Sequence, residues 1–343
     1  MAFFQSSVSV FMLLVATNFA IYAQSLDTTQ IDWSRYDYMP GQQLLFYDNF
    51  TADREGEAPE AWSIAEGGEV KAENFQNKLW LQARKESTAS PKDLVLPAQF
   101  TLEMDFYVFA EGYSGRYRVD LVAKNPEEWA SLTLEPLAVF FSMSNGLTSE
   151  KAVELRTGIH HLDLQVDGAG FKCYVDKHPV ITIPKSGSFA AVKIELFMPG
   201  PGDETGDDHC RVTDFFVAQG PASLQNQLNA SGKIVAYGIY FDAGKATLRP
   251  ESTPTLKQFA ELMQADASLS FSIECHDNER PEQSDNVKLS QGRAEALKDF
   301  LVETYRIPSN RLDTRGWGET RPLGEPGTVD GRKMNQRVEF IRK

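Results

Sequence analysis

The sequence predicts two parts of different fold class: an all-β antiparallel sandwich followed by an α+β domain. Between residues 44 and 217, short apolar runs alternate with Gly, Pro, Asn and Asp, and no amphipathic helix of ordinary length interrupts them. After residue 232, strand-like and helix-like periodicities alternate instead. The charge divides at the same place, because 17 Lys and Arg balance 17 Asp and Glu after residue 232, which leaves the whole net charge of -14 before it. We therefore expect two units with different roles.

Residues 1–23 are predicted to be a signal peptide. They carry no charge, and their apolar centre, residues 8–15, is far shorter than the roughly 20 residues that span a bilayer. The stretch ends in small residues around Ala20 and Ala23. A buried first strand or helix is the alternative. No later run reaches about 18 uncharged apolar residues, so we expect an exported protein with no transmembrane segment in its mature chain.

Residues 24–220 are expected to form the sandwich, after an irregular lead-in over residues 25–40. Many short strands at this spacing are typical of an antiparallel sandwich or jelly roll. The strands are expected at residues 44–47, 78–83, 100–109, 116–121, 132–134, 137–142, 161–166, 171–175, 191–197 and 211–217.

Two pairs of residues in the sandwich are candidates for a disulfide and for a metal site. Cys173 and Cys210 lie in the same part of an exported chain, so they are a plausible disulfide, and the alternative is that all three cysteines of the chain are buried thiols. Asp48 and Asp214 lie near the two chain ends of the sandwich and are candidates for a structural calcium ion, which needs 6–8 oxygen ligands. Apart from this calcium, no cofactor is expected.

Residues 221–232 are expected to be a helical turn or linker, and residues 233–343 the second domain. Apolar alternation predicts strands at 233–241 and 269–275, and 3.6-residue periodicity predicts helices at 254–263 and 290–305. Ser252 or Thr253 is the expected cap of the first helix, and Ser290 that of the second. Further strands at 311–316 and 336–341 complete a βαβαββ order, with the helices layered on one face of the sheet.

The second domain carries several short motifs in a fixed order. These are Gly-Ile-Tyr-Phe-Asp at 238–242, Ala-Thr-Leu-Arg-Pro at 246–250, Leu-Ser-x-x-Arg-Ala at 289–294, Gly-Trp-Gly-Glu at 316–319 and Asn-Gln-Arg-Val-Glu at 335–339. Together they resemble the OmpA-like peptidoglycan-binding domain along its full length. The resemblance implies non-catalytic binding of the cell-wall peptide.

In that family, an Asp at a strand end and an Arg on a helix hold the charged groups of diaminopimelate. The Arg matches Arg293, whose guanidinium can bind a carboxylate bidentately, although an ordinary pair with an acid is the alternative. Asn278 stands in the place of the Asp. Asp277, one residue earlier, would point the other way on a regular strand, but past a strand end it could swing in. Asn286 matches a family Asn near the pocket, and Arg337 lies near the ligand or serves the structure.

The first and last strands of the sandwich, residues 45–50 and 212–217, resemble those of a concanavalin-like or laminin-G-like jelly roll. Exported proteins that combine such a jelly roll with an OmpA-like domain are typical of Bacteroidota-type Gram-negative bacteria. A sugar-binding jelly roll would use an exposed aromatic platform, and Trp62, Trp80 and Trp129 are the candidates.

An enzyme is not expected. Glu103, Asp105 and Tyr107 share one face of a strand, where glycosidases of this fold carry a Glu, an Asp and a second Glu. The second Glu is absent here, so these side chains are expected to be the polar, solvated face of a sheet.

The sequence therefore predicts a periplasmic or outer-membrane-associated protein that anchors to peptidoglycan, while its jelly roll contacts a glycan or an outer-membrane protein. The alternative is a glycan- or protein-binding surface protein whose OmpA-like domain has lost wall binding and serves as an interaction module. The net charge of -14 argues against a nucleic-acid partner.

Overall fold

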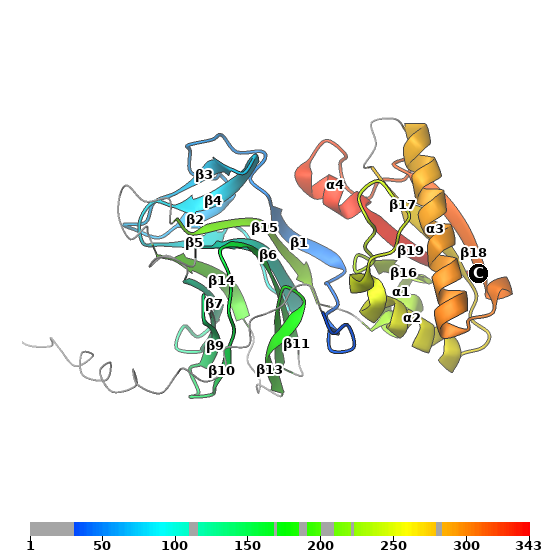
Figure 1. Cartoon of the computed structure of the whole chain (residues 1–343), viewed down its shortest axis with the longest axis horizontal. Helices are drawn as coiled ribbons and strands as arrows, with labels where there is room; N and C mark the ends of the chain where they lie inside the picture. The colour runs from blue at the N-terminus through cyan, green and yellow to red at the C-terminus, as the bar shows by residue number, and fades with distance from the viewer. Residues whose placement is uncertain are drawn as a thin grey trace, which may run out of the picture.

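The computed structural model describes residues 31–109, 116–167, 170–184, 191–199, 209–220, 223–278 and 283–343. The expected signal peptide at residues 1–23 lies outside these residues. Two bodies of secondary structure follow one another along the chain, an all-β sandwich and a mixed α/β domain (Figure 1). Among the described residues, no helix combines the length and the apolar character needed to cross a bilayer.

The sandwich consists of two antiparallel sheets. Its strands are β1 (Gln43–Asp48), β2 (Trp62–Ile64), β3 (Val70–Phe75), β4 (Lys78–Ala83), β5 (Ser87–Pro91), β6 (Phe100–Val108), β7 (Tyr117–Ala123), β8 (Trp129–Glu135), β9 (Ala138–Met143), β10 (Thr148–Ala152), β11 (Gly158–Asp167), β12 (Gly170–Val175), β13 (His178–Pro184), β14 (Ala191–Met198) and β15 (Arg211–Gln219). The eight-stranded sheet has the order β13-β12-β11-β6-β15-β4-β3, with β1 also paired to β15. The seven-stranded sheet has the order β10-β9-β8-β7-β14-β5-β2.

The all-β prediction for this part is confirmed, and each of the ten expected strands is present with its ends moved by a few residues. The structure adds β2, β3, β5, β10 and β13. Most of these are short or polar: β10, for example, is Thr-Ser-Glu-Lys-Ala and mostly exposed. Such a segment has no apolar alternation, and its pairing with β9 decides its conformation.

The core of the sandwich lies between the two sheets and follows the alternation of each strand. In β6, Leu102, Met104 and Phe106 point inward and are fully buried. Glu103 and Asp105 point to the opposite face, as the sequence predicts. The expectation that this face is solvated is wrong at Glu103, which is 8% exposed because the lead-in covers it and Tyr38 donates to its carboxylate. Burying each large apolar side chain contributes about 1.5–3 kcal/mol, so this repeated pattern fixes which face of every strand is inside.

The three cysteines are free thiols, and all are buried. Cys173 lies within β12, paired on both sides by β11 and β13, whereas Cys210 precedes β15 and its Sγ lies 3.8 Å from the carbonyl oxygen of Arg116. The structure therefore does not contain the expected disulfide, because each sulfur is packed in a different part of the core. Burial raises the pKa of the Cys173 thiol well above its usual range, which keeps it protonated and unreactive.

The C-terminal domain is a four-stranded sheet covered by helices on one face. Its elements are α1 (Leu224–Ser231), β16 (Lys233–Ala236), η1 (Pro250–Ser252), α2 (Thr253–Ala265), β17 (Phe271–His276), α3 (Gln283–Tyr305), η2 (Ser309–Arg311), β18 (Leu312–Gly318), α4 (Val329–Asn335) and β19 (Arg337–Arg342). The sheet order is β16-β19-β17-β18, and only β17 and β18 are parallel among the described strands. The helix α3 packs across β17 and β18 (Figure 1).

The strand expected at residues 233–241 ends at Ala236, and helix α4 was not expected. Two further details concern α3 and α1. First, Ser290 does not cap α3, which begins at Gln283; Ser290 is buried within the helix, and its hydroxyl donates to the carbonyl of Val287 at 2.9 Å. The first two turns of α3 are mostly polar, so they lack the 3.6-residue apolar periodicity that predicts a helix, and the sequence prediction began the helix too late. Second, of the two alternatives for residues 221–232, a helical turn or a linker, residues 224–231 form a helix, α1, and Leu224 and Leu228 are buried in the core of the C-terminal domain.

The lead-in before β1 passes between the sandwich and the C-terminal domain and contacts both. Tyr36 and Tyr38 pack around Tyr174 of the sandwich, while Met39 belongs to the core of the C-terminal domain. The lead-in lies closely against the C-terminal domain, since a Cβ added to Gly238 would lie 2.8 Å from Cδ of Pro40. The lead-in thus joins parts that are distant in sequence.

Candidate functional site

A buried ion pair joins the end of β17 to the middle of α3. Arg293 of α3 donates from Nη1 to the carboxylate of Asp277, which follows the last residue of β17. The two residues are only 6% and 1% exposed. Arg293 also donates from Nε to the carbonyl of Lys245 at 2.9 Å and from Nη2 to that of Asp242 at 3.3 Å. A guanidinium this deeply buried requires such acceptors, and burial lowers its pKa.

Asn278, which the sequence placed opposite Arg293, points elsewhere. It is only partly buried, and its amide donates to the carbonyl of Arg332 at 3.4 Å. Asp277, the alternative that the sequence left open, is the acid next to the arginine, and ligand binding by Asn278 stays a prediction. The physical reason is that β17 ends at His276. Asp277 is no longer bound by strand alternation, which leaves its side chain able to turn under α3.

The two other expected site residues are buried in the same domain. Asn286, in the first turn of α3, is fully buried, and its backbone lies against Gly318. Arg337 of β19 donates to the carboxylate of Glu339 at 2.7 Å and to the carbonyl oxygens of Asn335 and Arg321 at 3.2 and 3.1 Å. These contacts give Arg337 a structural role in holding the end of β19.

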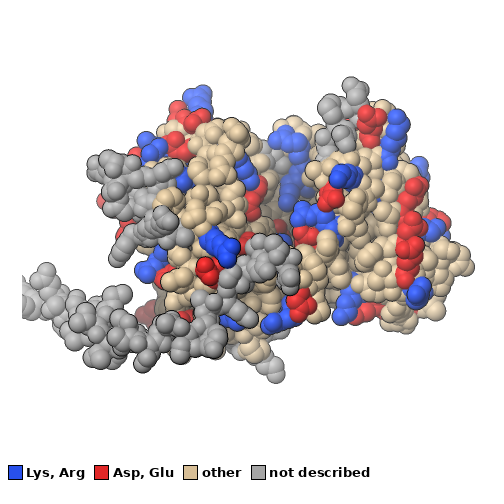
Figure 2. All heavy atoms as spheres, in the orientation of Figure 1, with Lys and Arg blue, Asp and Glu red and all other residues tan. Residues whose placement is uncertain are grey.

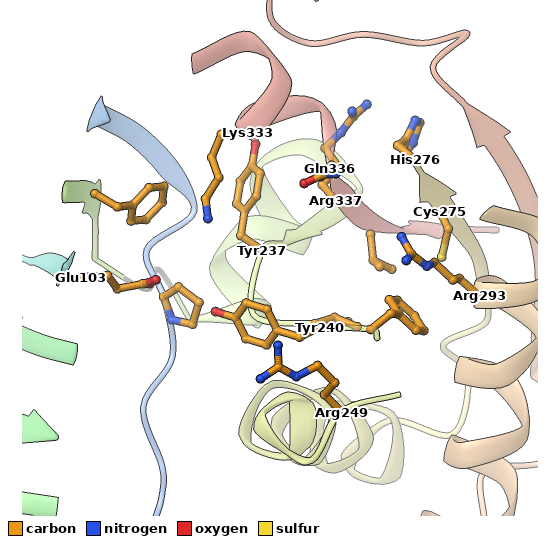
Figure 3. Close-up of a pocket in the computed structure, with 15 residues that line it drawn as sticks. Glu103, Tyr237, Tyr240, Arg249, Cys275, His276, Arg293, Lys333, Gln336 and Arg337 are labelled. Carbon is orange, nitrogen blue, oxygen red and sulfur yellow. The ribbon is translucent and has the colours of Figure 1, made fainter. Parts of the chain in front are cut away.

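A cavity of about 160 Å³ lies beside this ion pair, between the C-terminal domain and the sandwich. Arg249, Arg293, Lys333 and Arg337 line it from the C-terminal domain, and Glu103 of β6 lines it from the sandwich (Figure 3). In a space-filling view, Lys and Arg side chains gather beside α4, where it faces the sandwich (Figure 2). The cavity therefore has basic side chains on one wall and a carboxylate on the other, and Arg249, Arg293 and Arg337 are each paired with an acid of their own domain.

His276 also lines this cavity, and neither ring nitrogen has a hydrogen-bond partner among the described residues. Burial is the main reason why its pKa is lowered to about 4, and the positive charge of Arg337 adds to the effect. The nearest carboxylate oxygen, on Glu339, is 4.0 Å from Nε2. His276 is thus neutral at ordinary pH and offers a donor and an acceptor to the cavity.

A second polar cluster occupies the outer face of the eight-stranded sheet. Glu103, His161 and Asp163 bring ligand atoms within 4.8 Å of one another, which is compatible in size with a metal site. However, Lys177 Nζ is 3.0 Å from both oxygens of Asp163, and the His161 ring contacts Asp105 at 2.7 Å and Asp163 at 3.0 Å. Burial alone would lower the pKa of His161, but the charge of Asp163 raises it to about 10. An ammonium and an imidazolium already neutralise the carboxylates, so the cluster does not fit a metal ion.

The calcium candidates Asp48 and Asp214 are engaged by protein donors. Asp48 accepts from the indole of Trp62 at 2.8 Å, and Asp214 accepts from the hydroxyl of Tyr47 at 2.7 Å and from Lys78 at 2.6 Å. A calcium ion would have to compete with these contacts, and its binding stays a prediction.

Sequence reasoning did not find the cavity residues Glu103, Tyr237, Tyr240, Arg249 and Lys333 as a group. They come from β6, from the chain between β16 and η1, and from α4. No local pattern connects residues that are brought together only when the sandwich meets the C-terminal domain. Glu103 was singled out in the sequence, but for its place on a polar strand face.

Residues 240–336 match the OmpA family. Outer membrane porin F of Pseudomonas aeruginosa is 34% identical over 105 residues, which are 31% of this chain and 30% of that protein. The peptidoglycan-associated lipoprotein of Brucella melitensis is 35% identical over 85 residues, which are 25% of this chain and 50% of that protein. These residues therefore form an OmpA-like domain, as the motifs predict. The chain spans about a third to a half of the length of the curated relatives it matches.

A solved carbohydrate-binding module from Bacillus subtilis aligns with 46% of this chain and 96% of its own length, at 16% identity and a TM-score of 0.36. A similarity at this level says nothing about ligands.

Proposed function

We propose that this protein is a non-catalytic component of the cell envelope that binds peptidoglycan through its OmpA-like domain. The observation that carries the proposal is the pair of Asp277 and Arg293 at the end of β17, within residues that match the OmpA family. An acid and a guanidinium held side by side can bind both charged groups of an amino acid. Among the relatives, one is by name a peptidoglycan-associated lipoprotein, and others are outer-membrane proteins, which supports a place in the periplasm or at the outer membrane.

The ligand end that fits this pair is a zwitterion, such as the free amino acid end of diaminopimelate. Without ligand, Asp277 and Arg293 neutralise each other. A zwitterion can replace this contact with two others, its carboxylate on the guanidinium and its ammonium on the carboxylate, and no buried charge is left alone. A plain carboxylate would leave Asp277 unpaired, and a plain amine would leave Arg293 unpaired. The internal pair thus selects a ligand that has both charges.

The test is a calorimetric titration of the full chain with three compounds of similar length: meso-diaminopimelate, pimelate and 1,5-diaminopentane. We expect diaminopimelate to bind at least about tenfold more tightly than the other two, since each charged hydrogen bond contributes about 1.5–3 kcal/mol. Asp277→Asn and Arg293→Gln should remove binding, and Asn278→Ala should not. Co-sedimentation with purified peptidoglycan should follow the same order.

A second function is supported by the burial of the pair. Asp277 and Arg293 are almost inaccessible, and Glu103 and Phe216 of the sandwich narrow the cavity beside them. If neither peptidoglycan nor diaminopimelate binds, the OmpA-like domain serves as an interaction module, and the protein acts through its sandwich on a glycan or a protein partner. Phe216→Ala, which widens the cavity, distinguishes the two cases. If this variant binds diaminopimelate and the parent does not, the sandwich blocks the site; if neither binds, the domain has no such site.

The proposal excludes catalysis by the acidic cluster on the sandwich. Glu103 accepts a hydrogen bond from Tyr38 at 3.0 Å, and Asp163 is fully buried beneath Lys177 and Tyr36. Acids that are covered and neutralised in this way are poorly placed to reach a glycosidic bond. We expect no hydrolysis of polysaccharides by the full chain, measured by release of reducing ends.

A further inference from the structure

The tryptophan that the sandwich exposes is Trp129. Trp62 and Trp80 are 2% and 1% exposed, whereas Trp129, the first residue of β8, is 37% exposed. It lies on the outer face of the seven-stranded sheet. The C-terminal domain meets the other sheet, because Glu103 and Phe216 of the eight-stranded sheet line the cavity between them. The outer face that carries Trp129 is therefore on the side of the sandwich away from the C-terminal domain, where β7, β9 and β14 are seen in Figure 1.

A groove of about 470 Å³ runs over this face beside Trp129. Its floor is a row of polar side chains that crosses four adjacent strands: Glu195 of β14 pairs with Asp120 of β7, Asp120 with Ser131 of β8, and Ser131 with Ser142 of β9. At about 4.8 Å between strands, four strands extend about 14 Å, which is the scale of a short oligosaccharide.

The polar row is held in place by its own contacts. Arg118 donates from Nε to both oxygens of Asp120 at 3.0 and 2.8 Å, and the hydroxyl of Ser131 donates to Asp120 at 2.6 Å. The guanidinium of Arg118 stacks on the ring of Phe197, 4.5 Å from its centre. Asp120 is thus fixed in one orientation, and a carboxylate fixed in this way can accept from neighbouring hydroxyl groups of a sugar with little loss of side-chain entropy.

The charges of the groove are balanced. Arg118 is paired with Asp120, and Lys193, the neighbour of the groove on β14, is paired with Glu195 at 2.5 Å. An acidic or basic ligand therefore finds no uncompensated charge here. What remains is a set of hydroxyl and carboxylate groups next to an exposed indole. Sugars match both, because their rings have one face of C–H groups and a rim of hydroxyls.

We propose that the outer face of the seven-stranded sheet binds neutral oligosaccharides, with Trp129 as the stacking platform and Asp120 as the central acceptor. This deepens the proposed role of the sandwich as a contact surface. It is independent of peptidoglycan binding, since the groove and the Asp277–Arg293 pair lie on different bodies. The ligand lies across the strands, along the polar row, with one ring against the indole.

The experiment titrates the full chain with neutral oligosaccharides built from glucose, mannose, galactose, fructose or N-acetylglucosamine, and with an oligomer of galacturonic acid as the charged comparison. Tryptophan fluorescence and calorimetry report binding. We expect at least one neutral series to bind and the charged oligomer to bind more weakly. Trp129→Ala and Asp120→Asn should each lower the affinity by about tenfold or more.

The matched control is Ile159→Ala, which removes another exposed apolar side chain, from β11 of the opposite sheet. It should bind like the parent. Trp129→Ala should keep any binding of diaminopimelate, and Asp277→Asn should keep the oligosaccharide binding, so that failure of one proposal is distinguishable from failure of the other. The proposal is overturned if no neutral oligosaccharide binds, if the charged oligomer binds best, or if Trp129→Ala and Asp120→Asn bind as tightly as Ile159→Ala.

Discussion

Asp277 and Arg293 show how strongly a single buried pair constrains this domain. Each is a charged group taken out of water, and each is stable there only because the other is present. The same property makes the pair a candidate ligand site, since a zwitterion is the kind of molecule that can exchange with it. Stability and binding are therefore expected to respond to the same substitutions.

At the residue scale, Asp277→Ala should lower the free energy of unfolding by about 3 kcal/mol. The substitution leaves the guanidinium of Arg293 buried without its carboxylate, and removing one partner of a buried pair costs about 3–5 kcal/mol. Urea unfolding followed by circular dichroism measures the change. The neighbouring Asn278→Ala should change stability by no more than about 0.5 kcal/mol, because Asn278 is only partly buried and makes one long hydrogen bond. Equal losses in the two variants would contradict the assignment of Asp277.

His276 gives a prediction of pH dependence. Its folded-state pKa of about 4 lies below the ordinary value of 6.5, because burial and Arg337 disfavour the charged ring. Between these two values the unfolded chain binds a proton that the folded chain does not. His276 therefore contributes stability that is present above about pH 6.5 and is lost as the pH falls toward 4, at a slope of no more than about 1.4 kcal/mol per pH unit.

Proton NMR of the histidine rings measures this directly, with His276→Gln to assign the resonance. The His276 signal should stay constant from pH 8 to about pH 5.5 and move only near pH 4. The ring of His161, whose pKa is raised to about 10, should stay protonated over the same range. A His276 midpoint near 6.5 would show that the ring is accessible to water and not held in a closed cavity.

At the element scale, the helix α1 belongs to the C-terminal domain. Its N-terminus is capped by Ser223, whose hydroxyl accepts from the backbone of Asn226 at 3.2 Å, and Gly232 ends it in the left-handed conformation at φ 71°. Leu224 and Leu228 lie on its buried face. The element is short, so packing and caps, and not its intrinsic helix propensity, account for it.

Leu228→Ala should therefore lower the free energy of unfolding of the C-terminal domain by about 2–4 kcal/mol, the usual cost of emptying a buried leucine site. Gln225→Ala, an exposed change on the same helix, is the control and should have little effect. Likewise, a fragment of residues 223–343 should be more stable toward urea than a fragment of residues 233–343. If the two fragments unfold at the same urea concentration, α1 is a linker after all.

At the scale of the whole molecule, three contacts hold the sandwich against the C-terminal domain. Met39 of the lead-in is buried in the C-terminal core, Lys333 of α4 lies 5.6 Å from the ring centre of Tyr47 and 5.1 Å from that of Phe216, and Gly238 lies against Pro40. The cavity between the bodies exists only while these contacts persist. The arrangement of the two bodies therefore governs access to the Asp277–Arg293 pair.

Gly238→Ala tests this arrangement. A Cβ at this position would lie 2.4 Å from Oγ1 of Thr255 in α2 and 2.8 Å from Cδ of Pro40, so α2 and the lead-in must both give way. We expect faster proteolysis of the lead-in and a lower melting temperature. Gly292→Ala is the matched control: its Cβ meets nothing nearer than 3.6 Å, and alanine inside α3 should stabilise the helix by about 0.5–1 kcal/mol. If both variants behave alike, Gly238 is not closely packed against α2 and the lead-in.

Local sequence patterns were enough to predict the two fold classes, the strands of the sandwich with regular alternation, and the motifs of the OmpA-like domain with Arg293 among them. These follow from local periodicity and from side-chain types at fixed spacing, which every part of the chain carries without reference to the rest. Strands without alternation, such as β10, were missed because they carry no local periodicity. Only the pairing of β10 with β9 makes it a strand.

The tertiary structure alone decided which acid meets Arg293, whether residues 224–231 are part of a core, and which tryptophan faces solvent. Each depends on contacts between residues far apart in sequence. Asp277 turns toward α3 because β17 has ended. Helix α1 is held by the packing of Leu224 and Leu228 into the core of the C-terminal domain. Trp129 is exposed because, among the described residues, no other element packs on its face of the sheet. The cavity between the two bodies has no local signal at all, since its walls come from opposite ends of the chain.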